Sequence, residues 1–183
     1  MNQPDNNGVG EIYSRGPNSM LGYYKNEIAT TETFENDWFK TGDLGYFDED
    51  GFLFICGRKK NVIIASNGEN VYPEEIEDIL NRQPFVLECM VYGEKDEKHD
   101  ERIAALIVPD FSAFIEYANK NNMQINSELI DQLISRAIKE TNNQLVQFKQ
   151  IKKYYIQEKE LEKTTTQKVK RHLVVKTLSQ TNP

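Results

Sequence analysis

Asp43 is the first residue whose type and position could do chemistry. It lies between Gly42 and an apolar run at 44–47, where a strand is predicted. A carboxylate there can accept two hydroxyl hydrogen bonds at once, as the diol of a ribose would offer. Glycine and aspartate are also ordinary turn residues, so Thr41-Gly42-Asp43 taken alone is more often a turn or a cap than a ligand site.

A second candidate is the cationic run Gly57-Arg58-Lys59-Lys60, which follows the apolar run 52–55. It could bind an anion, and it could equally be a solvated strand end. A third is Ser66-Asn67-Gly68, a glycine-bearing turn just before a helix start at 72–77. A carboxylate, a cation-rich joint and such a turn, all within 38–77, suit a nucleotide-handling enzyme that moves.

Short strands and helices must position these residues. Asp48-Glu49-Asp50-Gly51 between two apolar runs predicts a hairpin, and Pro73 before apolar positions at i, i+3 and i+4 predicts a helix. Strands are expected at 11–14, 44–47, 52–55, 61–65, 85–92, 102–108 and 152–156, and helices at 30–34, from Pro73, at 111–120, at 127–142 with Ser127 as N-cap, and from about 169. The predicted fold class is therefore α+β: a small mixed α/β domain preceded by a β-rich part.

Composition narrows the class of protein. The 183 residues, with 38% apolar and 28% charged, are typical of a soluble globular protein. The sequence shows neither a membrane span nor a signal peptide, which favours the cytoplasm. Cys56 and Cys89 lie in apolar runs and are expected to be buried free thiols, and two histidines are too few for a zinc site.

The net charge of −7 is unevenly distributed, because residues 147–183 carry +6 and the remainder carries −13. A basic segment can be a solvated face, and few aromatic residues interleave with these cations. Nucleic acid is therefore not expected as a partner, whereas a phosphate-rich small ligand such as ATP or coenzyme A suits a local basic strip better.

The order of the motifs adds a family resemblance. The motifs at 10–12, 21–24, 41–43, 57–60, 68–77 and 164–171 resemble those of the adenylate-forming, AMP-binding superfamily. The sequence is most similar to the acyl-CoA synthetase branch, especially long-chain fatty acid:CoA ligases. The resemblance covers about residues 8–172.

The resemblance also implies a division into domains. Members of that family are several hundred residues long, and their phosphate-binding loop, acyl pocket and Mg²⁺ ligands precede the segment that this chain resembles. It implies that residues 1–57 end the large AMP-binding domain, 58–60 form a hinge, and 61–183 form the C-terminal lid domain. Such a chain is not expected to complete the reaction alone.

The implied reaction has two steps that use ATP, Mg²⁺ and coenzyme A. A carboxylic acid attacks the α-phosphate of ATP to give an acyl-adenylate, and the thiol of coenzyme A then displaces AMP. Lys168 occupies the position of the family's catalytic lysine, whose ammonium group stabilises charge in the first step. Gln167 stands where many relatives have glycine.

Other site residues also follow from the resemblance. Asp43 corresponds to the aspartate that binds the ribose hydroxyls, and Arg58 to an arginine near the ribose. Lys60 corresponds to the hinge position. Rotation there would exchange Lys168 for the turn of Ser66, Asn67 and Gly68, where the pantetheine arm of coenzyme A would pass.

Two alternatives stay open. The chain could belong to an adenylating enzyme that loads a carrier protein, or it could be a stand-alone module without catalysis. The expected partners are small molecules, namely a carboxylic acid, ATP and coenzyme A. Peripheral membrane contact of the full enzyme also stays open.

Overall fold

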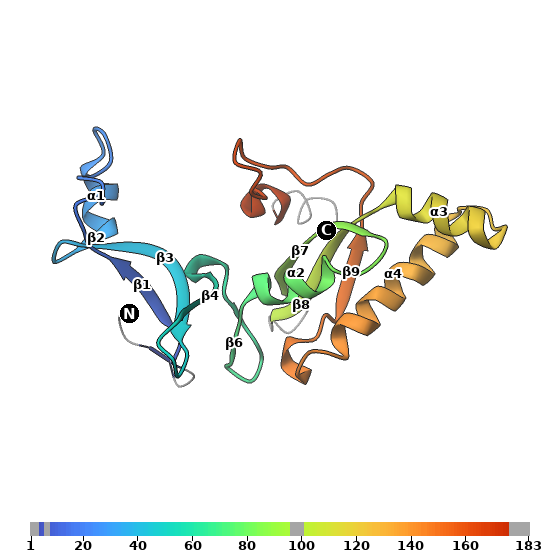
Figure 1. Cartoon of the computed structure of the whole chain (residues 1–183), viewed down its shortest axis with the longest axis horizontal. Helices are drawn as coiled ribbons and strands as arrows, with labels where there is room; N and C mark the ends of the chain where they lie inside the picture. Colours follow the sequence, from blue (N-terminus) through green and yellow to red (C-terminus); the bar gives the residue numbers. More distant parts are fainter. Residues whose placement is uncertain (1–3, 6–7, 96–100, 176–183) are drawn as a thin grey trace. The chain divides into compact units, whose positions relative to one another are not determined.

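The chain forms two compact units, Met1–Val62 and Ile63–Pro183, in a computed structural model that describes residues 4–5, 8–95 and 101–175 (Figure 1). The first unit contains β1 (Gly10–Ser14), α1 (Glu27–Thr33), β2 (Phe34–Glu35), β3 (Trp38–Phe47), β4 (Leu53–Arg58) and the 3-10 turn η1 (Lys59–Asn61). The second contains β5 (Ile63–Ile64), β6 (Asn70–Val71), α2 (Pro73–Leu80), β7 (Val86–Lys95), β8 (Glu101–Pro109), α3 (Phe111–Asn121), α4 (Ser127–Asn142), the 3-10 turn η2 (Gln147–Lys149) and β9 (Lys153–Ile156).

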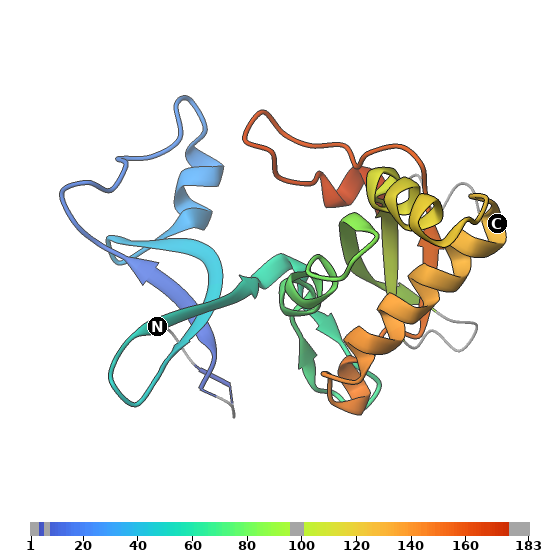
Figure 2. The same ribbon diagram turned by 45° about the vertical axis from the view of Figure 1, so that its right-hand side comes forward.

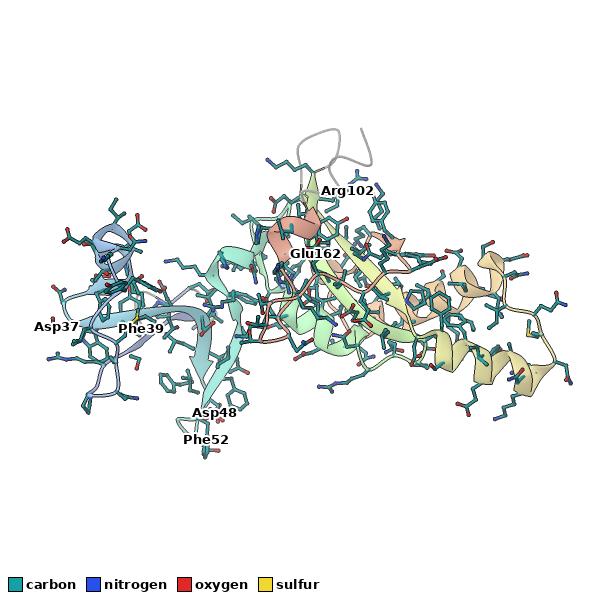
Figure 3. The ribbon with its side chains drawn as sticks, turned by 90° about the horizontal axis from the view of Figure 1, so that it is seen from above. Asp37, Phe39, Asp48, Phe52, Arg102 and Glu162 are labelled. Atoms are coloured by element: carbon teal, nitrogen blue, oxygen red, sulfur yellow. The ribbon has the colours of Figure 1, made fainter. Side chains whose placement is uncertain are left out.

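Strand β3 organises the first unit, because β1, β2 and β4 all pair with it in antiparallel fashion. The predicted β3–β4 hairpin is confirmed. Its turn is closed by Asp48, whose Oδ1 accepts from the backbone N–H of Phe52 at 2.7 Å, and both residues lie at the tip of the hairpin (Figure 3).

Two features of the first unit differ from the sequence prediction. The helix expected at 30–34 lies at Glu27–Thr33, because Asn26 caps it by accepting from the N–H of Ala29 at 3.0 Å. The short strand β2 was not predicted. It turns into β3 through Asn36 and Asp37, both with positive φ (49° and 65°), which is the backbone of a type I′ hairpin.

The first unit buries little apolar surface. Among its described residues, Cys56 is the one hydrophobic side chain that is buried. Large apolar side chains are instead exposed along the β3–β4 hairpin, namely Tyr46, Phe47, Phe52, Leu53, Phe54 and Ile55. Phe52 and Ile55 are 66% and 68% exposed. This sheet therefore lacks a packed core of its own.

The second unit is built on the sheet β7–β8–β9, in which β7 and β8 are antiparallel and β9 is parallel to β8. Both faces of this sheet are covered. Helices α2, α3 and α4 pack against one face, with Val91 and Ala105 in their core, and the segment 161–175 packs against the other, with Met90 and Leu106 in a second core (Figure 2). Burial on both faces explains why β7 and β8 are almost continuously apolar. The α+β fold class is confirmed.

The ends of two helices correct the sequence prediction. Ser127 is the first residue of α4 and not its N-cap, because Asn126 Oδ1 accepts the N–H of Leu129 at 2.8 Å. The last helix was expected from about 169, and the described helical residues are 171–175. Val169 is instead held in an antiparallel bridge with Lys163.

Candidate functional site

Asp43 and Arg58 form a cross-strand pair at the end of the β3–β4 hairpin. The two residues are register partners, and Arg58 Nε lies 3.0 Å from Asp43 Oδ1. The side chain of Arg58 remains 42% exposed and that of Asp43 36% exposed, so the pair is held in place and still open to a ligand. The structure thus brings together two of the residues that the sequence singled out.

Thr41 connects this pair to β1. Its carbonyl accepts from Arg58 Nη1 at 2.9 Å, and its hydroxyl donates to the carbonyl of Ile12 at 2.8 Å and accepts the N–H of Asp43 at 3.0 Å. Gly42 between them has a φ of +73°, and a Cβ there would lie 3.2 Å from Arg58 Nη1. The Thr-Gly-Asp motif therefore builds the support of the arginine as well as of the carboxylate.

A cavity of about 470 Å³ opens beside this pair. Thr41, Gly42 and Arg58 line it together with Glu11 and Lys59, while Asp43 is not among its lining residues. Lys59 Nζ binds Glu11 Oε2 at 2.9 Å, and this hydrogen bond raises the pKa of the lysine. The cavity is thus lined by paired charges and can hold a polar ligand.

Lys60 lies in η1 and is exposed. The first compact unit ends two residues later, at Val62. The chain around Lys60 therefore connects the two units.

Ser66, Asn67 and Gly68 form the exposed turn between β5 and β6. The N–H of Gly68 donates to the carbonyl of Ala65 at 2.8 Å, and the N–H of Glu69 to Asn67 Oδ1 at 3.2 Å. Gly68 has a φ of +83°, a conformation that favours glycine, and a Cβ there would meet no atom within 4 Å. The turn itself accounts for the glycine, and the space beside it is open.

Lys168 is exposed on a loop of the second unit that closes on itself. The N–H of Thr164 donates to the carbonyl of Lys168 at 2.8 Å, and the N–H of Lys168 to Thr164 Oγ1 at 3.2 Å. Gln167 has a φ of +62°, which is strained for a residue with a side chain. The glycine of many relatives would relieve this strain.

Half of the eight described cations of the basic strip are paired with acids of the second unit. Four ion pairs account for this, namely Lys149–Glu75, Lys153–Glu94, Lys163–Glu88 and Arg171–Glu77. Among the described residues, Lys168 forms no ion pair, and Lys176 lies outside them. The strip therefore supplies internal contacts of the second unit, and Lys168 is among its cations that form no ion pair in the described part of the chain.

Sequence reasoning missed several contributors. Thr41 could have been found as a hydroxyl two residues before Asp43, a spacing that favours a local side-chain bond. Glu11 and Arg171 lie in motifs that support the family resemblance, but no sequence pattern predicted their pairing, because their partners Lys59 and Glu77 lie far away in the sequence. In the described part of the chain, no group of three or more side chains could hold a metal ion.

With this geometry in hand, comparison with known proteins defines the class. The AMP-binding enzyme C-terminal domain family matches residues 60–181, so the chain belongs to that family. The proteins that it is similar to include acyl-CoA ligases, and the solved structures among them include complexes with an acyl-adenylate.

Two sequence relatives differ in substrate. The chain is 38% identical to the long-chain-fatty-acid–CoA ligase FadD15 of Mycobacterium tuberculosis over 178 residues, 90% of this chain and 29% of that protein. It is 48% identical to the 2-succinylbenzoate–CoA ligase of Bacillus cereus over 99 residues, 54% of this chain and 20% of that protein.

Solved structures agree on the fold. The o-succinylbenzoate CoA synthetase MenE of Bacillus subtilis, in complex with the acyl-adenylate OSB-AMP, aligns with a TM-score of 0.71 and 31% identity over 94% of this chain and 31% of that one. The anthranilate CoA ligase AuaEII, in complex with anthranoyl-AMP, aligns with a TM-score of 0.75 and 26% identity over 95% and 32%. The chain thus spans less than a third of the length of each of these relatives.

Proposed function

We propose that this chain supplies the C-terminal part of an ATP-dependent acyl-CoA ligase, which activates a carboxylic acid as acyl-adenylate and transfers it to coenzyme A. The Asp43–Arg58 pair carries the proposal. It fits a ribose diol, because the carboxylate is oriented by the arginine and is still partly exposed. Asp43 would accept the two ribose hydroxyls, and Arg58 would approach the same sugar.

Lys168 is proposed as the catalytic residue of adenylation. Its ammonium group would stabilise the negative charge that develops between the carboxylate and the α-phosphate. Removal of one well-placed donor of this kind costs about 3 kcal/mol, or about a hundredfold in rate. The exposed loop supports the proposal, because Lys168 has no ion pair among the described residues.

The turn of Ser66, Asn67 and Gly68 is proposed to receive the pantetheine arm of coenzyme A. Its support is the open space where a Cβ at Gly68 would lie. Residues 58–60 are proposed as the hinge between 1–57 and 61–183, with rotation at Lys60 exchanging the lysine loop for the turn between the two steps. The Mg²⁺ ligands would come from the part of the enzyme that this chain does not match.

The acid is proposed to be a long-chain fatty acid, which the match to FadD15 over 90% of this chain supports. A 2-succinylbenzoate-type aromatic acid is the second candidate, because identity rises to 48% over 99 residues with the ligase for that acid. The described helices include none that is long and apolar enough to cross a membrane. The two buried free thiols support a location in the reducing cytoplasm.

The test measures pyrophosphate release and acyl-CoA formation with ATP, Mg²⁺ and coenzyme A. A ladder of fatty acids and 2-succinylbenzoate would be offered to these 183 residues alone and to the reading frame extended upstream of residue 1. The proposal expects turnover by the extended enzyme only. Turnover by the 183 residues alone, or acyl transfer to a carrier protein in preference to coenzyme A, would contradict it.

A further inference from the structure

The loop that carries Lys168 is a small closed structure, which matters because a catalytic ammonium group must be held in place. Besides the two bonds between Thr164 and Lys168, the N–H of Gln167 donates to the carbonyl of Thr164 at 3.0 Å. The N–H of Lys170 donates to the carbonyl of Glu162 at 2.8 Å. Residues 163–170 are therefore tied together by internal hydrogen bonds, and their orientation depends on what holds the two ends.

The C-terminal end of the loop is held by Arg171. Its Nη1 donates to the carbonyl of Val91 in β7 at 2.8 Å, and its Nη2 binds Glu77 Oε2 in α2. The other oxygen of Glu77 accepts the N–H of Val91 at 2.6 Å. The side chains of Arg171 and Glu77 are only 22% and 13% exposed. One guanidinium group thus joins the loop to both α2 and β7.

The N-terminal end is held by a different carboxylate, that of Glu88 in β7. Glu88 Oε2 binds Lys163 Nζ at 2.6 Å, and Glu88 Oε1 accepts the N–H of Leu161 at 2.6 Å. These two ion pairs, Arg171–Glu77 and Lys163–Glu88, are the anchors of the loop, and in the sequence they lie on either side of Lys168. They use the flanking cations and leave the Lys168 ammonium group unpaired among the described residues.

We propose that Arg171 and Lys163 are positioning residues that fix the Lys168 loop on α2 and β7, and that adenylation depends on this fixation. The inference rests on the proposed function, and it adds to the proposed site two residues that do not contact the reacting groups. A lysine side chain is long and flexible, so the direction of its ammonium group depends on the backbone that carries it. A displacement of about 1 Å at a reacting centre can cost about a hundredfold in rate.

The first test uses hydrogen exchange on the 183-residue chain. Removal of Arg171 alone would strand a buried carboxylate, so the variant combines Arg171→Met with Glu77→Gln. Exchange of the amides at 164–170 should become about tenfold faster, while the amides of α4 keep their protection. Lys163→Met should have a similar effect. Lys170→Met removes an equal charge beside the anchor and is the matched control.

The second test separates the two half-reactions in the extended enzyme. The Arg171→Met/Glu77→Gln variant should lower pyrophosphate release about tenfold to a hundredfold. Thioester formation from supplied acyl-adenylate should stay within about threefold of wild type, because the Gly68 turn has its own hydrogen bonds. Arg171→Lys keeps the charge but not the forked geometry, and should be intermediate.

The outcomes distinguish the two proposals. If wild-type extended enzyme releases no pyrophosphate with any acid, the proposed function fails, and with it the dependence of adenylation on the anchors. If it is active but the double variant adenylates at the wild-type rate, only the positioning role fails. Equal losses in both half-reactions, or unchanged exchange at 164–170, would also overturn the positioning role.

Discussion

One oxygen of the Asp43 carboxylate is bound to Arg58, and this fixed orientation reduces the conformational entropy that is lost when a ligand binds. The arginine does not depend on the carboxylate in return, because its Nη1 is also held by the carbonyl of Thr41. A change at Asp43 should therefore weaken a ligand more than it disturbs the hairpin.

Asp43→Asn in the extended enzyme should raise the KM for ATP and lower kcat/KM about tenfold to a hundredfold, since a charge-assisted acceptor becomes a neutral one. Steady-state kinetics with varied ATP would measure this. Asp48→Asn makes the same chemical change at the tip of the same hairpin, where an amide oxygen can still accept the N–H of Phe52. Equal effects of the two substitutions would argue against a ribose site at Asp43.

Gln167 offers a test of loop strain. A non-glycine residue with positive φ costs about 1–2 kcal/mol, while glycine adds about 0.5–1 kcal/mol of chain entropy in the unfolded state. Gln167→Gly should therefore raise the free energy of unfolding of the second unit by about 0.5 kcal/mol, measured by urea denaturation. Gln167→Ala keeps the strain and serves as the control, so a similar gain from alanine would point to another cause.

The buried thiol of Cys89 should make the second unit less stable to unfolding at alkaline pH. Burial raises the pKa of this thiol above the ordinary value of 9.0, so above that pH the unfolded chain loses a proton that the folded chain keeps. Stability is full below pH 9 and falls as the pH rises further, by about 1 kcal/mol at pH 10 from this group. Burial also raises the pKa of Tyr92, which adds to the loss above pH 10.0.

The measurement is the free energy of unfolding from pH 6 to 10. Cys89→Ala should lower it by a constant amount between pH 6 and 8 and should lose less than wild type between pH 8 and 10. Parallel curves for the two proteins over the whole range would be inconsistent with a buried, protonated thiol.

At the scale of elements, the two neighbouring polar residues at the start of α4 have different roles, because Asn126 caps the helix and Ser127 lies inside it. Asn126→Ala removes the acceptor for the N–H of Leu129 and should cost about 1 kcal/mol of stability. Ser127→Ala changes a residue already inside the helix and should be almost neutral. Thermal unfolding of both variants would measure the difference, and a larger loss for Ser127→Ala would contradict the observed cap.

The elements themselves could be predicted where one periodic signal dominated. Helix α4 has an apolar stripe, and β7 and β8 are too apolar to be anything but buried strands. The shift of α1 and the cap of α4 could not be predicted as reliably, because asparagine and serine compete for the same role. The two-residue strand β2 depends on the backbone angles of Asn36 and Asp37, which composition alone does not determine.

Contacts between distant elements were also beyond the sequence. Charge counting found the basic strip at 147–183, but it could not show that Arg171 meets Glu77 or that Lys163 meets Glu88. Such pairs require the path of the chain across the far face of the sheet. The candidate site residues, by contrast, followed from the resemblance of the motif order to a known family, and their roles stay a prediction.

At the scale of the molecule, the two units should differ in their ability to fold alone. The second has a core on each face of its sheet, whereas the first buries one hydrophobic side chain among its described residues. Residues 63–183 expressed alone should unfold cooperatively on heating, and residues 1–62 should not, because they bury too little apolar surface. Calorimetry of the two pieces would decide.

A cooperative transition for residues 1–62 would show that the sheet of the first unit is self-sufficient. Loss of the transition for residues 63–183 would show that the second unit needs the first. Neither result bears on catalysis, which makes the experiment a test of the fold alone.

The exposed apolar side chains of the β3–β4 hairpin have a practical consequence for anyone who produces this chain. Strand β4 pairs with β3 along one edge, and the segment 52–56, which leads into β4, is wholly apolar, with neither charge nor proline. Segments of this kind add strands from other chains and attract chaperones when they are left uncovered. Inclusion bodies are therefore the expected product of overexpression, and a lysine introduced at Phe54 is the first solubilising change to make.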